Sequence, residues 1–129
     1  MRKVETQFGS GTYDQSVTVG SHHLMSDVDA SKGGADNGLS PHEYLAAALA
    51  SCTGMTLKMY AGRKSWALEN AIVTVNISRT DEVERFTREI TLVGNLDAEQ
   101  IARLLDIADK CPVHKALIGT IAIDTQLVP

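Results

Sequence analysis

The sequence predicts an α+β protein in which antiparallel sheets are wrapped around a long central helix. Three observations predict this class. Residues of alternating polarity near the N-terminus and in the middle of the chain are typical of strands. A segment of small and apolar residues from 41 to about 64 predicts one long helix. Two shorter helical patterns and a last apolar alternation follow the second group of strands.

The N-terminal part is rich in Val, Thr, Ser, Tyr and Gln, and glycine–serine turns divide it. We expect three strands there, at residues 3–8, 13–19 and 22–28. Residues 29–40 form the clearest loop, because they contain two glycine-bearing turn dipeptides. They lack the glycine spacing of a phosphate-binding loop, so we interpret them as a connection or a lid.

The long helix has a clear start. Ser40 is a favoured N-cap, Pro41 suits the first helical position, and Glu43 completes a capping box. Apolar or small side chains recur at helical spacing at Leu45, Leu49, Cys52, Met55, Thr56 and Met59. Such a helix needs neighbours on nearly every side, and a chain this short predicts that a second copy supplies some of them.

The second half alternates strands and helices. We expect an antiparallel hairpin of residues 71–79 and 85–93, a helix beginning at Asp97, a short helix at 113–118 and a last strand at 120–128. Arg79, Arg85 and Arg88 lie around the hairpin, either to assist an anion or as exposed strand arginines. Tyr60 and Trp66 are expected to serve packing.

Composition narrows the class of protein. A chain of 129 residues and 13.9 kDa predicts one domain, 1–129, and a net charge of −4 argues against nucleic-acid binding. The N-terminus does not resemble a secretory signal, and the apolar run at 44–57 is shorter than the roughly 20 residues of a membrane span. We therefore expect a cytoplasmic protein that does not bind membranes and keeps its thiols reduced.

The two cysteines, Cys52 and Cys111, are too few for a disulfide scaffold. Cys111 precedes Pro112 and is a predicted N-cap, where free backbone N–H groups and the helix dipole favour a thiolate; His114 lies three residues on. Cys111 could equally be a small apolar residue that fills a corner between helices. Cys52, in mid-helix, is either an inert core residue or a peroxide-reducing thiol that needs a second thiol as its resolving partner.

Zinc binding is the rival hypothesis. His42, Cys52, Cys111 and His114 could in principle form a Cys2His2 site. His42 and Cys52 are ten residues apart, about 15 Å along one helix, whereas ligands of one zinc lie about 3–4 Å apart. We therefore expect no metal and no cofactor.

Two segments carry a family resemblance. Residues 40–52, Ser-Pro-His-Glu-Tyr-Leu-Ala-Ala-Ala-Leu-Ala-Ser-Cys, resemble the central-helix signature of the OsmC/Ohr family. Residues 111–117, Cys-Pro-Val-His-Lys-Ala-Leu, resemble that family's second cysteine motif. The resemblance covers the chain from about residue 12 to the end, and residues 55–66 resemble the YhfA-like branch.

The resemblance implies an OsmC-like fold in an intertwined homodimer. It implies thiol-dependent reduction of organic hydroperoxides or hydrogen peroxide, in defence against oxidative stress. Cys52 matches the peroxidatic position and Cys111 the resolving position, whose disulfide an external dithiol or a lipoylated protein reduces.

Two positions depart from the family pattern. His42 stands where the family's glutamate follows the proline, and Glu43 comes one residue later, a turn of about 100° around a helix. The N-terminal strands and loop also lack the family's arginine and contain only Lys32 as a nearby base. The catalytic hypothesis therefore counts His42 and Glu43 with the two cysteines as catalytic residues, and it expects His42 or Lys32 to substitute for the groups that the family pattern has and this sequence lacks. The alternative is a non-catalytic protein of the same fold that senses redox state or binds a small apolar ligand.

Overall fold

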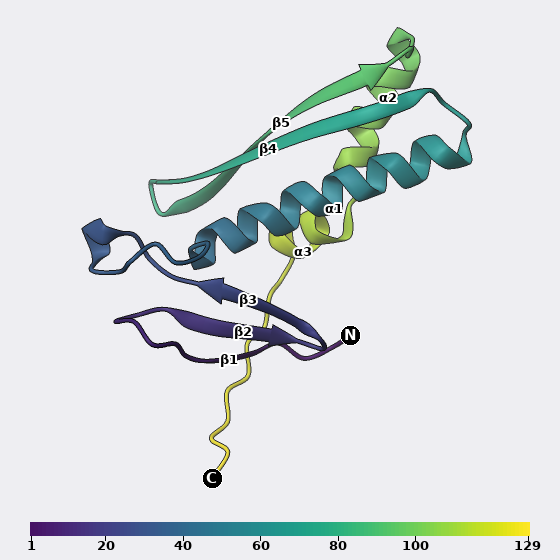
Figure 1. Ribbon diagram of the computed structural model, residues 1–129. Helices are drawn as coiled ribbons and strands as arrows, with labels where there is room; N and C mark the ends of the chain where they lie inside the picture. Colours follow the sequence, from purple (N-terminus) through teal and green to yellow (C-terminus); the bar gives the residue numbers. More distant parts are fainter. The chain divides into compact units, whose positions relative to one another are not determined.

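The computed structural model describes residues 1–129, which divide into two compact units, 1–45 and 46–129 (Figure 1). It is an α+β structure with antiparallel sheets and one long helix, as the sequence predicts. The prediction of a single domain stays a prediction. No helix is long and apolar enough to span a membrane.

The first unit contains a three-stranded antiparallel sheet in the order β1-β2-β3. Its strands are β1 (Glu5–Phe8), β2 (Gln15–Val19) and β3 (His22–Ser26), so the three predicted strands are confirmed with shorter bounds. Gly20 has a φ of 59° between β2 and β3, a conformation that glycine adopts without a steric penalty. The sheet buries no large apolar side chain, and the buried residues of this unit are Asp14, Ser26 and Asp27.

Asp27 organises the glycine-containing loop that follows the sheet. Its carboxylate accepts hydrogen bonds from the backbone N–H groups of Val28 (2.8 Å), Ala35 (3.2 Å) and Asn37 (3.0 Å). These bonds, led by the one from Asn37, lower the pKa of Asp27. The loop includes a short 3₁₀ helix, η1 (Ala30–Lys32), and is therefore a structured connection.

The second unit is built on a long antiparallel hairpin of β4 (Leu68–Thr80) and β5 (Val83–Gly94). The predicted hairpin is confirmed, but its strands are longer and its turn shorter than expected. Asp81 and Glu82 form the turn with φ values of 52° and 63°. Two positive φ values are typical of the type I′ turn, whose twist matches that of a hairpin.

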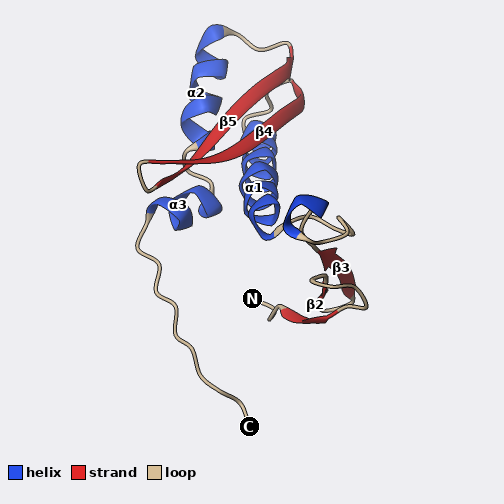
Figure 2. Cartoon of the chain, turned by 90° about the vertical axis from the view of Figure 1, so that its left-hand side faces the viewer, coloured by secondary structure: helices blue, strands red, loops and turns tan.

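Helices α1 (Pro41–Arg63) and α2 (Ala98–Ala108) pack on one face of this hairpin, and α3 (Pro112–Ile118) follows α2 (Figures 1 and 2). The core joins α1 and α2 through Leu57, Ala61, Leu104, Ile107 and Ala108. Strand side chains Leu68, Ala71, Ile90 and Leu92 pack against it, together with Tyr60, Trp66 and Leu96. The capping box predicted at Asp97 is confirmed, with Gln100 as its second member.

Only some of the residues that recur at helical spacing in α1 are buried. The buried residues are Leu49, Thr53, Leu57 and Ala61, whereas Leu45, Met55 and Met59 are exposed. A helix with small or apolar side chains on nearly every side does not mark which side faces the hairpin. The periodic pattern therefore predicted the helix correctly but did not identify which side packs against the hairpin.

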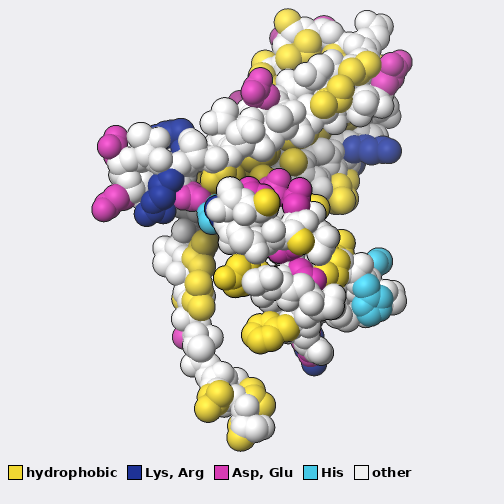
Figure 3. All heavy atoms as spheres, turned by 60° about the vertical axis from the view of Figure 1, so that its left-hand side comes forward, with side chains coloured by type: hydrophobic (Ala, Val, Ile, Leu, Met, Phe, Trp, Pro, Cys, Tyr) yellow, Lys and Arg dark blue, Asp and Glu magenta, His cyan; other side chains and the backbone are white.

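The strand predicted at 120–128 is absent, and this is a correction. The segment after α3 forms no regular element, and its apolar side chains are exposed, Ile123 by 85% and Leu127 by 93% (Figure 3). A strand needs a neighbouring backbone to pair with its N–H and C=O groups, and no strand of the chain pairs with this one. Alternating polarity predicts the tendency to form a strand but does not provide its partner.

Candidate functional site

The interior of α1 positions Cys52 and Thr53. Cys52 is half-buried, whereas Thr53 is fully buried. The hydroxyl of Thr53 donates a hydrogen bond of 2.7 Å to the carbonyl of Leu49, one turn back in the helix. Because Cys52 lies in the interior of a regular helix, the backbone N–H groups near its sulfur are already bonded to carbonyl groups of the helix.

The connection between α2 and α3 positions Cys111 as the predicted N-cap. Cys111 has extended backbone angles (φ −65°, ψ 141°), Pro112 occupies the first turn, and the Cys111 sulfur accepts a hydrogen bond of 3.3 Å from the His114 N–H. The side chain is fully buried. The predicted N-cap is therefore confirmed.

The two cysteines meet. Both are free thiols, and their side chains lie 3.4 Å apart. Burial raises the pKa of Cys111, but hydrogen bonds from the His114 N–H, the Cys52 side chain and the Thr53 hydroxyl together lower it below the ordinary value. The more buried sulfur of the pair is therefore the one that its surroundings favour as a thiolate.

Arg88 is the residue that the sequence interpretation left undecided, and it lies beside the pair. On β5 it follows Phe86 and precedes Ile90 on the partly buried face of the strand, and its side chain is only 12% exposed. Its guanidinium donates to the Thr53 hydroxyl at 3.1 Å and to the carboxylate of Asp109 at 2.8 Å. A charged residue between the apolar residues Phe86 and Ile90 in the same register of the strand was the signal that could have identified it.

His114 contributes through its backbone and through its ring. Its ring nitrogen Nδ1 lies 3.1 Å from an Arg88 Nη2 atom and 3.9 Å from the Asp109 carboxylate. A guanidinium can only donate, so in its bond to Arg88 Nδ1 accepts, which places the ring hydrogen on Nε2. His114 therefore supports the sulfur with its N–H and supports Arg88 with its ring.

His42 and Glu43 belong to the first unit, where they lie in the first turn of α1. Glu43 forms the predicted capping box, since its carboxylate accepts from the Ser40 N–H at 2.8 Å and its own N–H donates to the Ser40 hydroxyl at 3.2 Å. These contacts with Ser40 lower the pKa of Glu43. Lys32 and Glu43 also line a pocket of about 310 Å³ with Asp27, Val28, Asp29, Asp36 and Ser40. Catalytic roles for His42 and Glu43 stay predictions.

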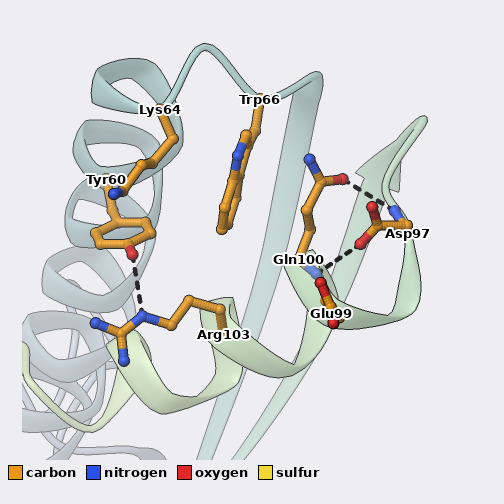
Figure 4. A pocket seen from close by; sticks show the side chains of 7 residues that line it. All are labelled: Tyr60, Lys64, Trp66, Asp97, Glu99, Gln100 and Arg103. Carbon is orange, nitrogen blue, oxygen red and sulfur yellow. Dashed lines mark hydrogen bonds between the residues drawn. The ribbon is translucent and has the colours of Figure 1, made fainter.

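A second pocket, of about 370 Å³, lies between the end of α1 and the start of α2 (Figure 4). Tyr60 meets Trp66 edge to face with ring centroids 5.5 Å apart, and the Tyr60 oxygen accepts a 3.0 Å hydrogen bond from Arg103. Neither cysteine lines this pocket. Tyr60 and Trp66 pack against the core, as predicted.

No group of three or more His, Cys, Asp or Glu side chains is arranged to hold a metal ion. The site itself offers two thiols in contact, N–H and O–H donors that favour one of them as an anion, and a part-buried guanidinium. Such a pair can be oxidised to a disulfide.

Comparisons with known proteins place this site in a family. Residues 33–126 match the family model described as OsmC-like protein, and no curated protein matches the chain. An OsmC-like protein from Mycoplasma pneumoniae has a similar structure, with a TM-score of 0.79 and 16% identity over 92% of this chain and 88% of the other.

Two further solved structures have the same fold. The organic hydroperoxide resistance protein OhrB of Bacillus subtilis gives a TM-score of 0.60 and 24% identity over 92% of this chain and 91% of that one. The organic hydroperoxide resistance protein OsmC from Legionella pneumophila gives 0.66 and 21% over 92% and 90%. The resemblance stated from the two cysteine motifs is thus confirmed at the level of the family. Since the family model spans well over half of its residues, the chain belongs to the OsmC-like protein family.

Proposed function

We propose that the chain is a thiol-dependent peroxidase that reduces organic hydroperoxides or hydrogen peroxide through Cys52 and Cys111, in defence against oxidative stress. The observation that carries this proposal is the contact between the two free thiols, 3.4 Å apart. Membership of a family that includes hydroperoxide peroxidases supports it. A cysteine peroxidase needs an accessible sulfur and a second thiol within reach, and the chain has both.

The burial of the two sulfurs supports the division of their roles. Cys52 is half-buried and open to a peroxide, whereas Cys111 is fully buried. The Cys52 sulfur attacks the terminal peroxide oxygen, the O–O bond breaks, and Cys52 becomes a sulfenic acid. The alkoxide that leaves takes up the thiol proton of Cys52, which can pass through the Cys111 sulfur, and departs as the alcohol.

Cys111 then resolves the sulfenic acid. Its thiolate attacks the Cys52 sulfur, the S–O bond breaks, and hydroxide leaves and is protonated to water. An external dithiol, or a lipoylated protein, reduces the Cys52–Cys111 disulfide and is itself oxidised to a disulfide. The lowered pKa of Cys111 favours this step because the thiolate is the nucleophile.

His42 and Glu43 are proposed as further catalytic groups, with Lys32 as the alternative cation. The Glu43→Gln variant separates catalysis from capping, because glutamine also completes a capping box but has no charge. We expect slower peroxide consumption at unchanged helix content, measured by circular dichroism. An unchanged rate would exclude a role for the carboxylate.

We propose an intertwined homodimer of the YhfA-like branch that acts in the cytoplasm. Proteins of the OsmC family are typically dimers. Exposed Met55 and Met59 on α1, and the exposed apolar segment after α3, offer surfaces that a second copy can cover. Two free thiols suit a reducing compartment. Sedimentation equilibrium tests the dimer.

The function is tested with purified protein, cumene hydroperoxide or hydrogen peroxide, and dithiothreitol or dihydrolipoamide as the reductant. We expect catalytic consumption of peroxide well above that of the Cys52→Ser/Cys111→Ser double variant. Turnover at the level of this control would overturn the peroxidase proposal. A Cys52–Cys111 disulfide that forms without turnover would instead favour a redox sensor.

A further inference from the structure

Arg88 is a part-buried cation with four hydrogen-bond partners. The register of the hairpin places it opposite Val75, and its side chain is 12% exposed. Removing a guanidinium from water is costly unless hydrogen bonds replace its hydration. The partners that meet this need come from three separate segments of the second unit.

The first partner lies on α1 and the others lie around α3. Nη1 donates to the Thr53 hydroxyl at 3.1 Å and to the carbonyl of Ala108 at 3.3 Å. Nη2 donates to the Asp109 carboxylate at 2.8 Å and to His114 Nδ1 at 3.1 Å. One side chain therefore joins β5 to the middle of α1, to the end of α2 and to α3.

These partners flank the two cysteines. Thr53 directly follows Cys52 in the chain, and Ala108, Asp109 and His114 lie on either side of Cys111. Thr53 also lies 3.9 Å from the Cys111 sulfur, and the His114 N–H donates to it. The guanidinium thus contacts the backbone of Ala108 before Cys111 and the ring of His114 after it, while it also contacts Thr53, the neighbour of Cys52.

We infer that Arg88 is a positioning residue for the thiol pair: its planar fork ties the segment from Ala108 to His114 to α1, so that the Cys111 sulfur is held against Cys52. It acts through Thr53, Asp109 and His114. A lysine offers a single flexible ammonium group and cannot reproduce four directed contacts on three segments. Arg88 therefore sets how readily the two sulfurs form a disulfide.

In the proposed peroxidase this geometry would set the rate of resolution, so the functional importance of the inference rests on the proposed function. The geometric claim can be measured without any peroxide. In a glutathione buffer, the dithiol and one glutathione disulfide yield the Cys52–Cys111 disulfide and two glutathione thiols. The equilibrium constant is the effective molarity of one thiol towards the other, and it depends steeply on their relative position.

The experiment compares the effective molarity in the wild type, Arg88→Lys, Asp109→Asn and Arg85→Lys. Arg85 is a matched control because it lies on the same strand, on the exposed face. Asp109→Asn removes the negative charge from one partner of Arg88 and leaves an amide oxygen that still accepts a hydrogen bond, so it weakens this anchor. The Asp109 side chain is 67% exposed, so the variant tests the same network in a protein that keeps its core. Circular dichroism of the reduced proteins checks that each variant is folded.

We expect Arg88→Lys to lower the effective molarity by about tenfold or more, because small displacements of reacting groups have effects of this size. Asp109→Asn should lower it less, and Arg85→Lys should leave it within twofold. Equal values in the wild type, Arg88→Lys and Asp109→Asn would overturn the inference, as would an equal loss in Arg85→Lys. A wild type that forms its disulfide but does not turn over peroxide would contradict the proposed function alone.

Discussion

Cys52 and Cys111 reach the same point of the molecule from two different kinds of backbone. Cys52 lies in the middle of α1, where neighbouring carbonyls already occupy the N–H groups, and its side chain is half-buried. Cys111 lies at the start of α3, where an N–H group is free to donate to its sulfur, and its side chain is fully buried. Cys52 is thus the less buried of the two residues, and Cys111 has the hydrogen bonds that stabilise a negative charge on sulfur.

When two thiols are in contact, the thiol that is more exposed to a substrate need not be the one whose thiolate is stabilised. A fully exposed N-capping thiolate would be open to any oxidant or metal. Here the favoured thiolate belongs to a fully buried residue, and the half-buried Cys52 lies 3.4 Å away. The arrangement fits a sequence in which Cys52 reacts first and Cys111 completes the disulfide.

Removing each thiol separately is the strongest test of the different roles proposed for Cys52 and Cys111. Cys52→Ser should abolish peroxide consumption, because the accessible sulfur is lost. Without added reductant, Cys111→Ser should consume about one equivalent of peroxide per chain and then stop with Cys52 as a sulfenic acid, since no second thiol is present to displace the oxygen. A dimedone adduct detected by mass spectrometry checks the second outcome.

The same experiment can reverse the assignment. If Cys52→Ser retains the single equivalent and Cys111→Ser loses it, then peroxide reaches the buried thiol, and the roles proposed from burial are exchanged. The double variant sets the background of both measurements.

Substitution of Thr53 tests the contact between α1, which carries Cys52, and Arg88, which also contacts residues around Cys111. Its buried hydroxyl accepts from Arg88 at 3.1 Å and donates to the Leu49 carbonyl at 2.7 Å. Thr53→Val keeps the shape and removes both bonds, together with the 3.9 Å contact of the hydroxyl with the Cys111 sulfur, so we expect the free energy of unfolding to fall by about 1–3 kcal/mol in urea titrations.

Thr56→Val is the matched control for this prediction. Thr56 is a half-buried threonine on the same helix, and its substitution should change the free energy of unfolding by less than about 0.5 kcal/mol. Equal effects of the two substitutions would mean that the Thr53 hydroxyl adds no specific stability.

The contrast between the two cysteines also explains what the sequence could predict. The N-cap at Cys111 and the capping boxes at Ser40 and Asp97 depend on residues within one turn, so local rules identified them. The face of α1 that carries Thr53 depends on the hairpin that packs against it. That contact is non-local, and a helix apolar on all sides gives no sign of it.

Arg88 and the C-terminal segment also show that local sequence rules do not predict non-local contacts. Arg88 could have been recognised from strand register, because the alternation that leaves Arg85 exposed buries Arg88. Its contacts with Thr53 and His114 could not have been predicted, because these residues lie far from Arg88 in the sequence. The predicted strand at 120–128 failed because a strand depends on a partner backbone, which its own residues cannot supply.

The titration of Cys111 provides a smaller effect that also tests the difference between the two cysteines. Because hydrogen bonds lower the pKa of Cys111 in the folded protein, the folded state releases this proton at a lower pH than the unfolded chain. The stabilisation is fully present above the ordinary thiol pKa and is lost as the pH falls through the lowered value. Under reducing conditions, the free energy of unfolding of the wild type relative to Cys111→Ala should therefore rise with pH across this interval.

Cys52→Ala distinguishes the sources of this shift. It removes the hydrogen bond from the Cys52 side chain and keeps those from the His114 N–H and the Thr53 hydroxyl, so the pKa of Cys111 should move up only part of the way. Thiolate absorbance in the ultraviolet follows the titration directly. A pKa unchanged by Cys52→Ala would mean that the backbone of α3 alone determines the acidity of Cys111, and that its contact with Cys52 serves only the formation of the disulfide.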